Sequence, residues 1–523
     1  MSAVKPKLAL LVLSFVIALP ASVWFLRSSP ENFPLDDAYI HLGYARSLAS
    51  GAGFSFNPGE HSFGTTSPLW VFALASAVSW INPYWLALTI SFLSFCASLF
   101  LSSLIIFREA EQKNWARLDG LLTALFPALF LVSFGNYLWL VFSGMETALW
   151  VALILAAVYF SIREKPSWIG YLFLGLAGLC RMESLLLVPV AFFWQIFNVK
   201  DRRKVWAGNL AALLIAFSFY VYAHFALGSF FPVTRSGKLA SDLFNSGLSL
   251  KGGMSFMFRH IAYIKLTQPQ MFLLIGYTIL VSAIWIAARR RAKFRLGKVG
   301  AFSIFALLVF AYHDQFFRST LIITPYHNMR YQVLFFPALA LGLMRASMEL
   351  ISWSAFPRGR TALRSIFLLI VLLAVSFSRM PGWRKLYRDQ SRHIQDVHLQ
   401  AAKWCKQNLP PSARIACFDI GSLRFLSGRY VIDLGGLVDP GIAPYLTAKQ
   451  TGPYLKDKKA THYIELGTPG SERVTGVEKD AGKLYQLTPM ANFAGARIQE
   501  PVLLHSWEMK VYKINWIENK DTP

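Results

Sequence analysis

Long apolar stretches alternate with short basic clusters over the first 380 residues, and this pattern predicts a helical protein that crosses a membrane repeatedly. The first apolar stretch, residues 8–26, is long enough to span a bilayer. Lys5 and Lys7 precede it, and they predict a cytoplasmic N-terminus because basic residues favour that side. A cleaved signal peptide, with the small residues Ala18 and Ala21 near the cut, is the alternative, but the later spans favour an uncleaved helix.

The later apolar segments continue this alternation. The segment at residues 68–81 is short, so we expect it to lie in the outer interface rather than to cross. With that assignment every basic cluster falls on the cytoplasmic side, and the chain crosses the membrane about eleven times. The clearest spans are residues 84–107, 121–134, 206–227, 271–288, 300–312 and 365–377.

The pattern changes at about residue 380, where the chain becomes polar and rich in turns. We therefore predict two parts, a transmembrane module over residues 1–380 and a small soluble α/β domain over residues 381–523, outside the cytoplasm. Ile394, Val397 and Ala401 recur at helical spacing. Asp419–Gly421 and residues 433–436 are interpreted as strand ends and turns without chemistry. Strands are expected at residues 414–418, 429–432, 463–466 and 509–514.

Composition supports a membrane protein and excludes an ordinary soluble enzyme, since mean hydropathy is +0.42 and 55% of the residues are hydrophobic. The net charge of +24 would suit a nucleic-acid partner, but the basic residues lie between apolar spans, so we predict none. The spacing of Cys and His residues shows no metal-binding motif. Of the four cysteines, Cys405 and Cys417 lie in the C-terminal part, and a disulfide between them is left open.

Two adjacent carboxylates, Asp36 and Asp37, lie in the predicted outer loop at residues 27–66. Pro34 precedes them and Gly51 follows at the expected end of a helix, so helix capping alone could explain an acid here. Other polar residues are also expected at the outer ends of spans, where a charge must be solvated, paired or functional. Acids together with cations would suit an anionic lipid headgroup that carries hydroxyl groups. The set comprises Asp36, Asp37, Glu146, Arg181, Glu183, Lys238, His327, Arg330 and Tyr331.

Several short motifs occur in order over nearly the whole chain. They are 36-DDAY-39, 44-YAR-46, 53-GFSFNPGE-60, 66-TSPLW-70, 143-SGMET-147, 180-CRME-183, 231-FPVT-234 leading to Lys238, 330-RY-331 and 427-SGRYVID-433. With these motifs the sequence resembles the GT-C glycosyltransferases that use polyprenyl-phosphate sugars, and most nearly the branch that contains mycobacterial arabinofuranosyltransferases. Met182 and Met145 depart from the motifs, which have proline and often leucine there, and neither change removes a functional group.

The resemblance implies a bacterial cytoplasmic-membrane enzyme, active on the outer face, that moves a sugar from a polyprenyl-phosphate donor to a glycan, lipid or protein acceptor. It implies Asp36 as the base, with Asp37 in a secondary role. A divalent cation is compatible with this transfer but not required. We expect the donor phosphate and substrate among Tyr44, Arg46, Glu146, Arg181, Glu183, Lys238, His327, Arg330 and Tyr331, with Lys238 and Arg330, on outer loops beside spans, as the leading candidates for the phosphate.

The chemistry of the residues agrees with such a transfer. A sugar phosphoester has a good leaving group, so the reaction needs one base for the acceptor hydroxyl and cations for the departing phosphate. A hydrolase would need two opposed carboxyl groups, and adjacent residues on a helix point about 100° apart. A lipid-linked glycan transporter and a glycan-binding scaffold are the alternatives. A transporter would commonly place its ionisable groups near the bilayer midplane.

Overall fold

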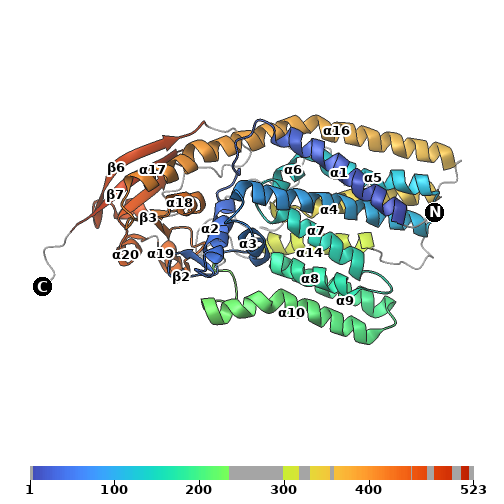
Figure 1. Cartoon of the computed structure of the whole chain (residues 1–523), viewed down its shortest axis with the longest axis horizontal. Helices are drawn as coiled ribbons and strands as arrows, with labels where there is room; N and C mark the ends of the chain where they lie inside the picture. Colours follow the sequence, from blue (N-terminus) through green and yellow to red (C-terminus); the bar gives the residue numbers. More distant parts are fainter. Residues whose placement is uncertain are drawn as a thin grey trace.

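The computed structural model describes residues 4–234, 298–316, 330–353, 358–448, 450–467, 476–496 and 508–517. Figure 1 shows an elongated molecule with a layer of long helices at one end and a sheet at the other. Helices α2 (Asp37–Ala49) and α3 (Pro68–Ala75) lie between the two ends. Helix α16 (Arg358–His393) runs along the helical part and continues through the π-helix η3 (Ile394–Leu399) into α17 (Gln400–Asn408).

The helices of the first part coincide with most of the apolar segments found in the sequence. The short segment expected at the interface is α3, which has eight residues. The remaining helices are α1 (Val4–Leu26), α4 (Pro83–Gln112), α5 (Arg117–Ser133), α6 (Gly135–Val141), α7 (Thr147–Ser161), α8 (Trp168–Cys180), η1 (Met182–Leu186), α9 (Leu187–Asn198), α10 (Arg202–Leu227), α14 (Lys298–Phe316), η2 (Arg330–Gln332) and α15 (Phe335–Trp353).

Four helices among the described residues are long and apolar enough to cross a membrane, namely Pro6–Leu26, Pro83–Gln112, Arg202–Leu227 and Arg330–Glu349. The pair α5 and α6, bent by 76°, makes a fifth span if it is taken as one. The predicted span at residues 271–288 lies outside the described residues. The count of about eleven crossings therefore stays a prediction.

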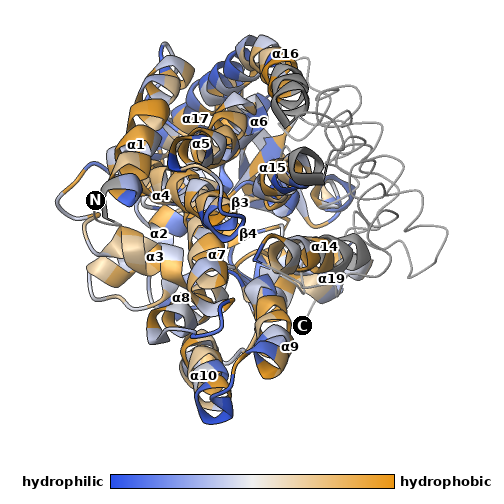
Figure 2. Cartoon of the chain, turned by 90° about the vertical axis from the view of Figure 1, so that its right-hand side faces the viewer, coloured by the Kyte–Doolittle hydropathy of each residue, from blue (hydrophilic) through white to orange (hydrophobic). Residues whose placement is uncertain are grey.

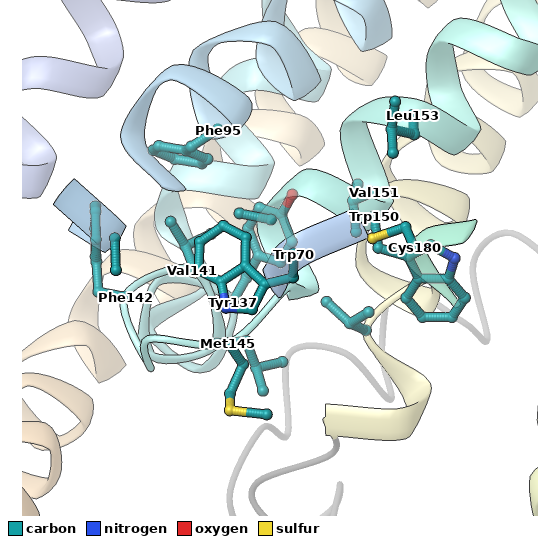
Figure 3. Packing of buried hydrophobic residues seen from close by; sticks show 14 of the residues in the cluster. Trp70, Phe95, Tyr137, Val141, Phe142, Met145, Trp150, Val151, Leu153 and Cys180 are labelled. Carbon is teal, nitrogen blue, oxygen red and sulfur yellow. The ribbon is translucent and has the colours of Figure 1, made fainter. Parts of the chain in front are cut away.

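The helical part has a closely packed centre and an apolar outside. Helix α7 is buried along almost its whole length, and Figure 3 shows Trp150, Val151 and Leu153 of this helix in the core with Trp70 and Cys180. The outer helices instead present apolar side chains outward, such as Phe225 on α10 with 83% of its surface exposed. Figure 2 shows hydrophobic colour on the visible surfaces of several helices, α1 among them. Such outward-facing apolar surface suits contact with lipid.

The C-terminal part contains a five-stranded sheet in the order β4-β3-β5-β7-β6. Strands β4, β3 and β5 are parallel, while β7 and β6 pair in antiparallel fashion. Short helices connect the parallel strands, as such crossovers require. The strands are β3 (Arg414–Cys417), β4 (Tyr430–Asp433), β5 (His462–Leu466), β6 (Tyr485–Ala494) and β7 (Glu508–Trp516), and the helices α18 (Gly421–Ser427), η4 (Pro440–Ile442), α19 (Ala443–Ala448), α20 (Gly452–Asp457) and α22 (Val477–Asp480).

Hydrogen bonds join the loop at residues 27–66 to this sheet. They come from the hairpin of this loop, β1 (Ser55–Asn57) with β2 (Glu60–His61). The Asn57 amide donates to the carbonyl of Val431 at 2.9 Å and accepts from its N–H at 3.0 Å. Asn57 thereby pairs with the open edge of β4 as a neighbouring strand would. Arg424 adds a bond to the carbonyl of Phe56 at 2.9 Å. These contacts fix α2, which precedes the hairpin, against the C-terminal part.

All four cysteines are buried and free. Cys405 lies on α17 and Cys417 at the end of β3, and no disulfide joins them. This result settles the disulfide that the sequence leaves open.

Candidate active site

The two aspartates at the start of α2 contact different partners. The carboxylate of Asp36 accepts hydrogen bonds from the N–H groups of Gly421 at 2.6 Å and Ser422 at 2.8 Å. Asp36 occupies the N-cap position of its own helix but makes no side-chain capping bond there. Asp36 thus caps a different helix, α18, because the N–H groups at the start of a helix need acceptors.

Asp36 belongs to a titratable group with the buried His398 and the partly exposed Asp419. His398 lies on η3, and its Nε2 is 3.1 Å from the Asp419 carboxylate. Burial raises the pKa of Asp36, and the nearby charge of His398 opposes that rise. Burial lowers the pKa of His398, but the hydrogen bond and charge of Asp419, with the charge of Asp36, raise it above its ordinary value. Both groups therefore hold protons more tightly than they would in an unfolded chain.

Asp37 faces the helical part instead. Its carboxylate lies 2.9 Å from the guanidinium of Arg330, and 33% of the Asp37 side chain is exposed whereas Arg330 is buried. Arg330 also donates to the hydroxyl of Tyr331 at 3.0 Å. The structure thus brings together one predicted acid and two residues predicted to hold the donor phosphate.

Next to this pair lies a second group, in which Arg181 and Glu146 are buried and Glu183 is nearly so. Arg181 bonds to Glu146 at 2.7 Å and to Glu183 at 2.7 Å, and its guanidinium lies over the ring of Trp150, which Figure 3 shows beside Cys180. The guanidinium is also 5.3 Å from the centre of the Tyr331 ring. Because two carboxylates already neutralise Arg181, this residue is suited to positioning the site rather than to capturing a phosphate.

His41 connects the acids to the first outer loop. Its Nε2 lies 3.7 Å from Glu146, and its Nδ1 is 2.8 Å from the hydroxyl of Thr65. Neither residue was singled out from the sequence. A signal for His41 did exist, because it follows Asp37 by four positions and so shares the same face of α2. For Thr65 the sequence carries no such signal, since only the fold brings the loop back onto the helix.

The described part of this group, which we call the Asp37 cluster, carries a net negative charge. It holds three carboxylates, Asp37, Glu146 and Glu183, against the two guanidiniums of Arg181 and Arg330. Lys238 and His327, also predicted for the site, lie outside the described residues. Within those residues no group of three or more His, Cys, Asp or Glu side chains is arranged to hold a metal ion.

Two other predicted residues lie away from this cluster. The hydroxyl of Tyr44 pairs with Ser62 at 2.7 Å and accepts from the N–H of Gly64. Arg46 stacks on the ring of Phe425 and donates to its carbonyl at 2.8 Å. Both contacts join α2 to neighbouring segments, so the structure gives them a packing role.

Solved structures of known proteins share the fold of this chain. The chain is similar to ArnT from Cupriavidus metallidurans bound to undecaprenyl phosphate, with a TM-score of 0.58 at 13% identity over 96% of this chain and 97% of that one. The apo form of the same protein gives 0.55 at 14% identity, covering 98% of both chains. An Archaeoglobus fulgidus oligosaccharyltransferase in complex with Zn and sulfate aligns less well, with a TM-score of 0.48 at 10% identity over 89% of this chain and 69% of that one.

Sequence comparison adds one family. A domain of unknown function, DUF8728, matches residues 384–512, and no curated protein matches the chain. Since the ArnT likeness runs over nearly the full length of both proteins, this chain shares the fold of that ArnT structure. Among the described residues the chain is mostly helical, and four of its helices are long and apolar enough to cross a membrane. The mycobacterial branch that the motifs resemble is not among these structures.

Proposed function

We propose that this protein is a membrane glycosyltransferase that moves a sugar from a polyprenyl-phosphate donor to an acceptor hydroxyl of the cell envelope. The observation that carries the proposal is the Asp37 cluster, a partly exposed carboxylate beside a buried guanidinium, on a fold shared with a structure bound to undecaprenyl phosphate. The acceptor oxygen would attack the anomeric carbon, its proton would pass to a carboxylate, and the polyprenyl phosphate would leave. Arg330 would hold the departing phosphate, since a guanidinium matches its oxygens with two donors.

The roles that we propose for the two aspartates depart from the sequence prediction of Asp36 as the base. Both Asp36 oxygens already accept backbone hydrogen bonds from α18, whereas Asp37 is partly exposed and contacts Arg330. A donor phosphate that takes over Arg330 would leave the Asp37 carboxylate to accept the proton of the acceptor hydroxyl. Asp36 would then act as a positioning residue that holds α2 against α18.

A phosphate would add negative charge beside the described carboxylates of the cluster. Lys238, which the sequence predicts for the donor phosphate, would be a further cation of the site, and a divalent cation is compatible with the transfer. Turnover that survives EDTA would show that no divalent cation is needed.

The position of the cluster favours an enzyme over a transporter. Glu146 precedes α7, Arg181 follows α8, and Asp37 begins α2, so all three lie at helix ends. Groups at helix ends suit chemistry at the membrane surface, whereas transporters commonly bind near the midplane. From the basic bias of the other loops we propose the outer face of a bacterial cytoplasmic membrane as the location.

The test compares matched aspartate variants of the purified, full-length protein supplied with polyprenyl-phosphate sugars, with release of polyprenyl phosphate measured by mass spectrometry. Asp37→Asn should lower turnover by about 100- to 10,000-fold, the usual range for loss of a general base, at an unchanged melting temperature. Asp36→Asn should instead lower the melting temperature, because an amide cannot accept both backbone N–H groups. Asp119→Asn, an exposed change on α5, is the control.

Two outcomes would contradict these assignments. Full loss of turnover in Asp36→Asn at an unchanged melting temperature would restore Asp36 as the base. If the wild-type protein released no polyprenyl phosphate from any donor, the transferase function itself would be refuted.

A further inference from the structure

A separate cavity lies where the first outer loop meets the sheet. Its volume is about 480 Å³, within the range of about 300–1,000 Å³ that is usual for small-molecule sites. The β1–β2 hairpin, the segment that follows α10, and the carboxyl end of β4 form its walls. The carboxyl ends of parallel strands are a common place for ligands in α/β sheets. Asp37 and Arg330 are not among its lining residues.

The polar side chains of this cavity are held in place by bonds between its walls. The Tyr430 hydroxyl donates to Glu60 across the gap between β4 and the hairpin. Asp439 accepts from the hydroxyl of Tyr454 at 2.9 Å and forms an ion pair with Lys458. The Asn57 bonds to Val431 fix the hairpin wall against β4. The cavity therefore requires little rearrangement to receive a ligand.

The chemistry of the lining selects a neutral ligand rich in hydroxyl groups. Three carboxylates, of Glu60, Asp433 and Asp439, line the cavity together with Lys458 and His61. Asp433 is buried and already accepts backbone hydrogen bonds, so Glu60 and Asp439 are the carboxylates that face a ligand. This balance disfavours a phosphate or carboxylate ligand. Carboxylates accept hydrogen bonds from hydroxyls, and aromatic rings offer flat apolar faces to the C–H groups of a sugar. The rings at this cavity are Phe56, Phe63, Tyr430 and Tyr454.

One short segment joins the cavity to the Asp37 cluster. Ser62 and Phe63 line the cavity, and Thr65 bonds to His41 of the cluster at 2.8 Å. Ser62 and Thr65 are three positions apart, so their Cα atoms are separated by at most about 10 Å. A saccharide of two or more units could therefore occupy the cavity with one unit and present a hydroxyl of another to Asp37.

We propose that this cavity binds a neutral sugar unit of the acceptor, one or more units back from the hydroxyl that receives the transferred sugar. The acceptor part of this inference rests on the proposed transferase function. The saccharide site itself does not, because it depends only on the cavity and its lining.

The experiment measures glycoside binding to the full-length protein in detergent by saturation-transfer NMR. The probes are methyl β-D-glucopyranoside, methyl α-D-mannopyranoside and methyl α-D-arabinofuranoside, with mannose 6-phosphate as the anionic comparison. Glu60→Gln and Ser229→Phe, which would fill the wall after α10, should each weaken glycoside binding at least tenfold. Glu31→Gln, an exposed change in the same outer loop, is the matched control, and melting temperatures verify that each variant is folded.

The variant Asp37→Asn separates this inference from the proposed function. Glycoside binding that survives in Asp37→Asn but is lost in Glu60→Gln and Ser229→Phe supports the cavity, even if no donor is turned over. Absence of glycoside binding at millimolar concentration, equal binding by all variants, or preferential binding of mannose 6-phosphate would overturn the inference, even if the protein proves to be a transferase.

Discussion

At the scale of single residues, the pair Asp36 and Asp37 shows what a sequence can and cannot reveal. Their position in an outer loop and their carboxyl groups were readable from the sequence, and so was the helix that follows. Their partners were not, because Gly421 and Arg330 lie about 300 or more positions away in the chain. His398 and Asp419 were missed for the same reason, since a turn aspartate gives no sign that a distant histidine reaches it.

The contacts of Arg330 lead to a prediction about donor binding. Arg330→Lys keeps the charge but loses the planar pair of donors, so donor affinity should fall by about 10- to 100-fold. Titration of a polyprenyl-phosphate sugar against the purified protein would measure the change. Arg163→Lys, on the exposed turn after α7, should bind donor like the wild type. If Arg330→Lys and Lys238→Ala both kept wild-type affinity, the proposed phosphate contacts would be wrong.

The protonation of His398 predicts how folding stability depends on pH. Its raised pKa means that the stabilisation is fully present below about 6.5 and is lost as pH rises through the folded-state value. The raised pKa of Asp36 acts in the same direction from about pH 4 upward. These two groups should therefore contribute a fall in melting temperature with rising pH, and His398→Gln should remove the His398 contribution above pH 6.5.

The matched control for this measurement is His224→Gln, at the exposed end of α10. It should follow the wild-type profile between pH 4 and 9. A His398→Gln profile parallel to the wild type would show that this histidine does not contribute to the pH dependence.

At the scale of elements, helices were easier to predict than strands and junctions. Apolar segments located α1, α3, α4 and α10 because burial or lipid contact demands a continuous apolar run. The four expected strands coincide with β3, β4, β5 and β7. Strand β6 was missed, since this edge strand is largely exposed and shows little alternation of buried and exposed residues. The bonds of Asn57 to β4 likewise depend on tertiary contact alone.

The junction of α2 and α18 predicts an effect of adding one methyl group. A Cβ at Gly421 would collide with the backbone carbonyl oxygen of Asp36, so one element would have to move. Gly421→Ala should lower the free energy of unfolding by about 1–3 kcal/mol, the usual cost of overpacking. Gly382→Ala on α16 is the control, because a Cβ there meets no atom within 4 Å. Equal melting temperatures for the two variants would show that the junction is loose.

At the scale of the whole molecule, the contacts impose a constraint on membrane topology. Asp36 bonds to Gly421 and Arg46 to Phe425, so the outer loop and the C-terminal part must lie on the same side of any membrane. The helical character of the first part was readable from hydropathy. The number of crossings stays a prediction, because several apolar helices are shorter than a full span.

The accessibility of engineered cysteines would show which side of the membrane each part of the chain faces. Lys456→Cys, exposed on α20, should react with a membrane-impermeant maleimide in intact cells. Lys165→Cys, in the turn between α7 and α8, should react only after the cells are permeabilised. The four native cysteines are buried and should contribute little background. The reverse pattern would invert the proposed orientation and place the Asp37 cluster in the cytoplasm.

The π-helix at Ile394–Leu399 determines which changes of chain length this molecule can tolerate. A π turn holds one residue more than an α turn, so the residues beyond it are rotated by about 100° relative to an uninterrupted α-helix. Deleting one codon here would straighten the junction between α16 and α17 and turn His398 away from Asp36. An insertion or deletion between the helical part and the sheet should therefore be tolerated only together with a second change that restores this rotation. The exposed turn after α7, in contrast, can lengthen freely.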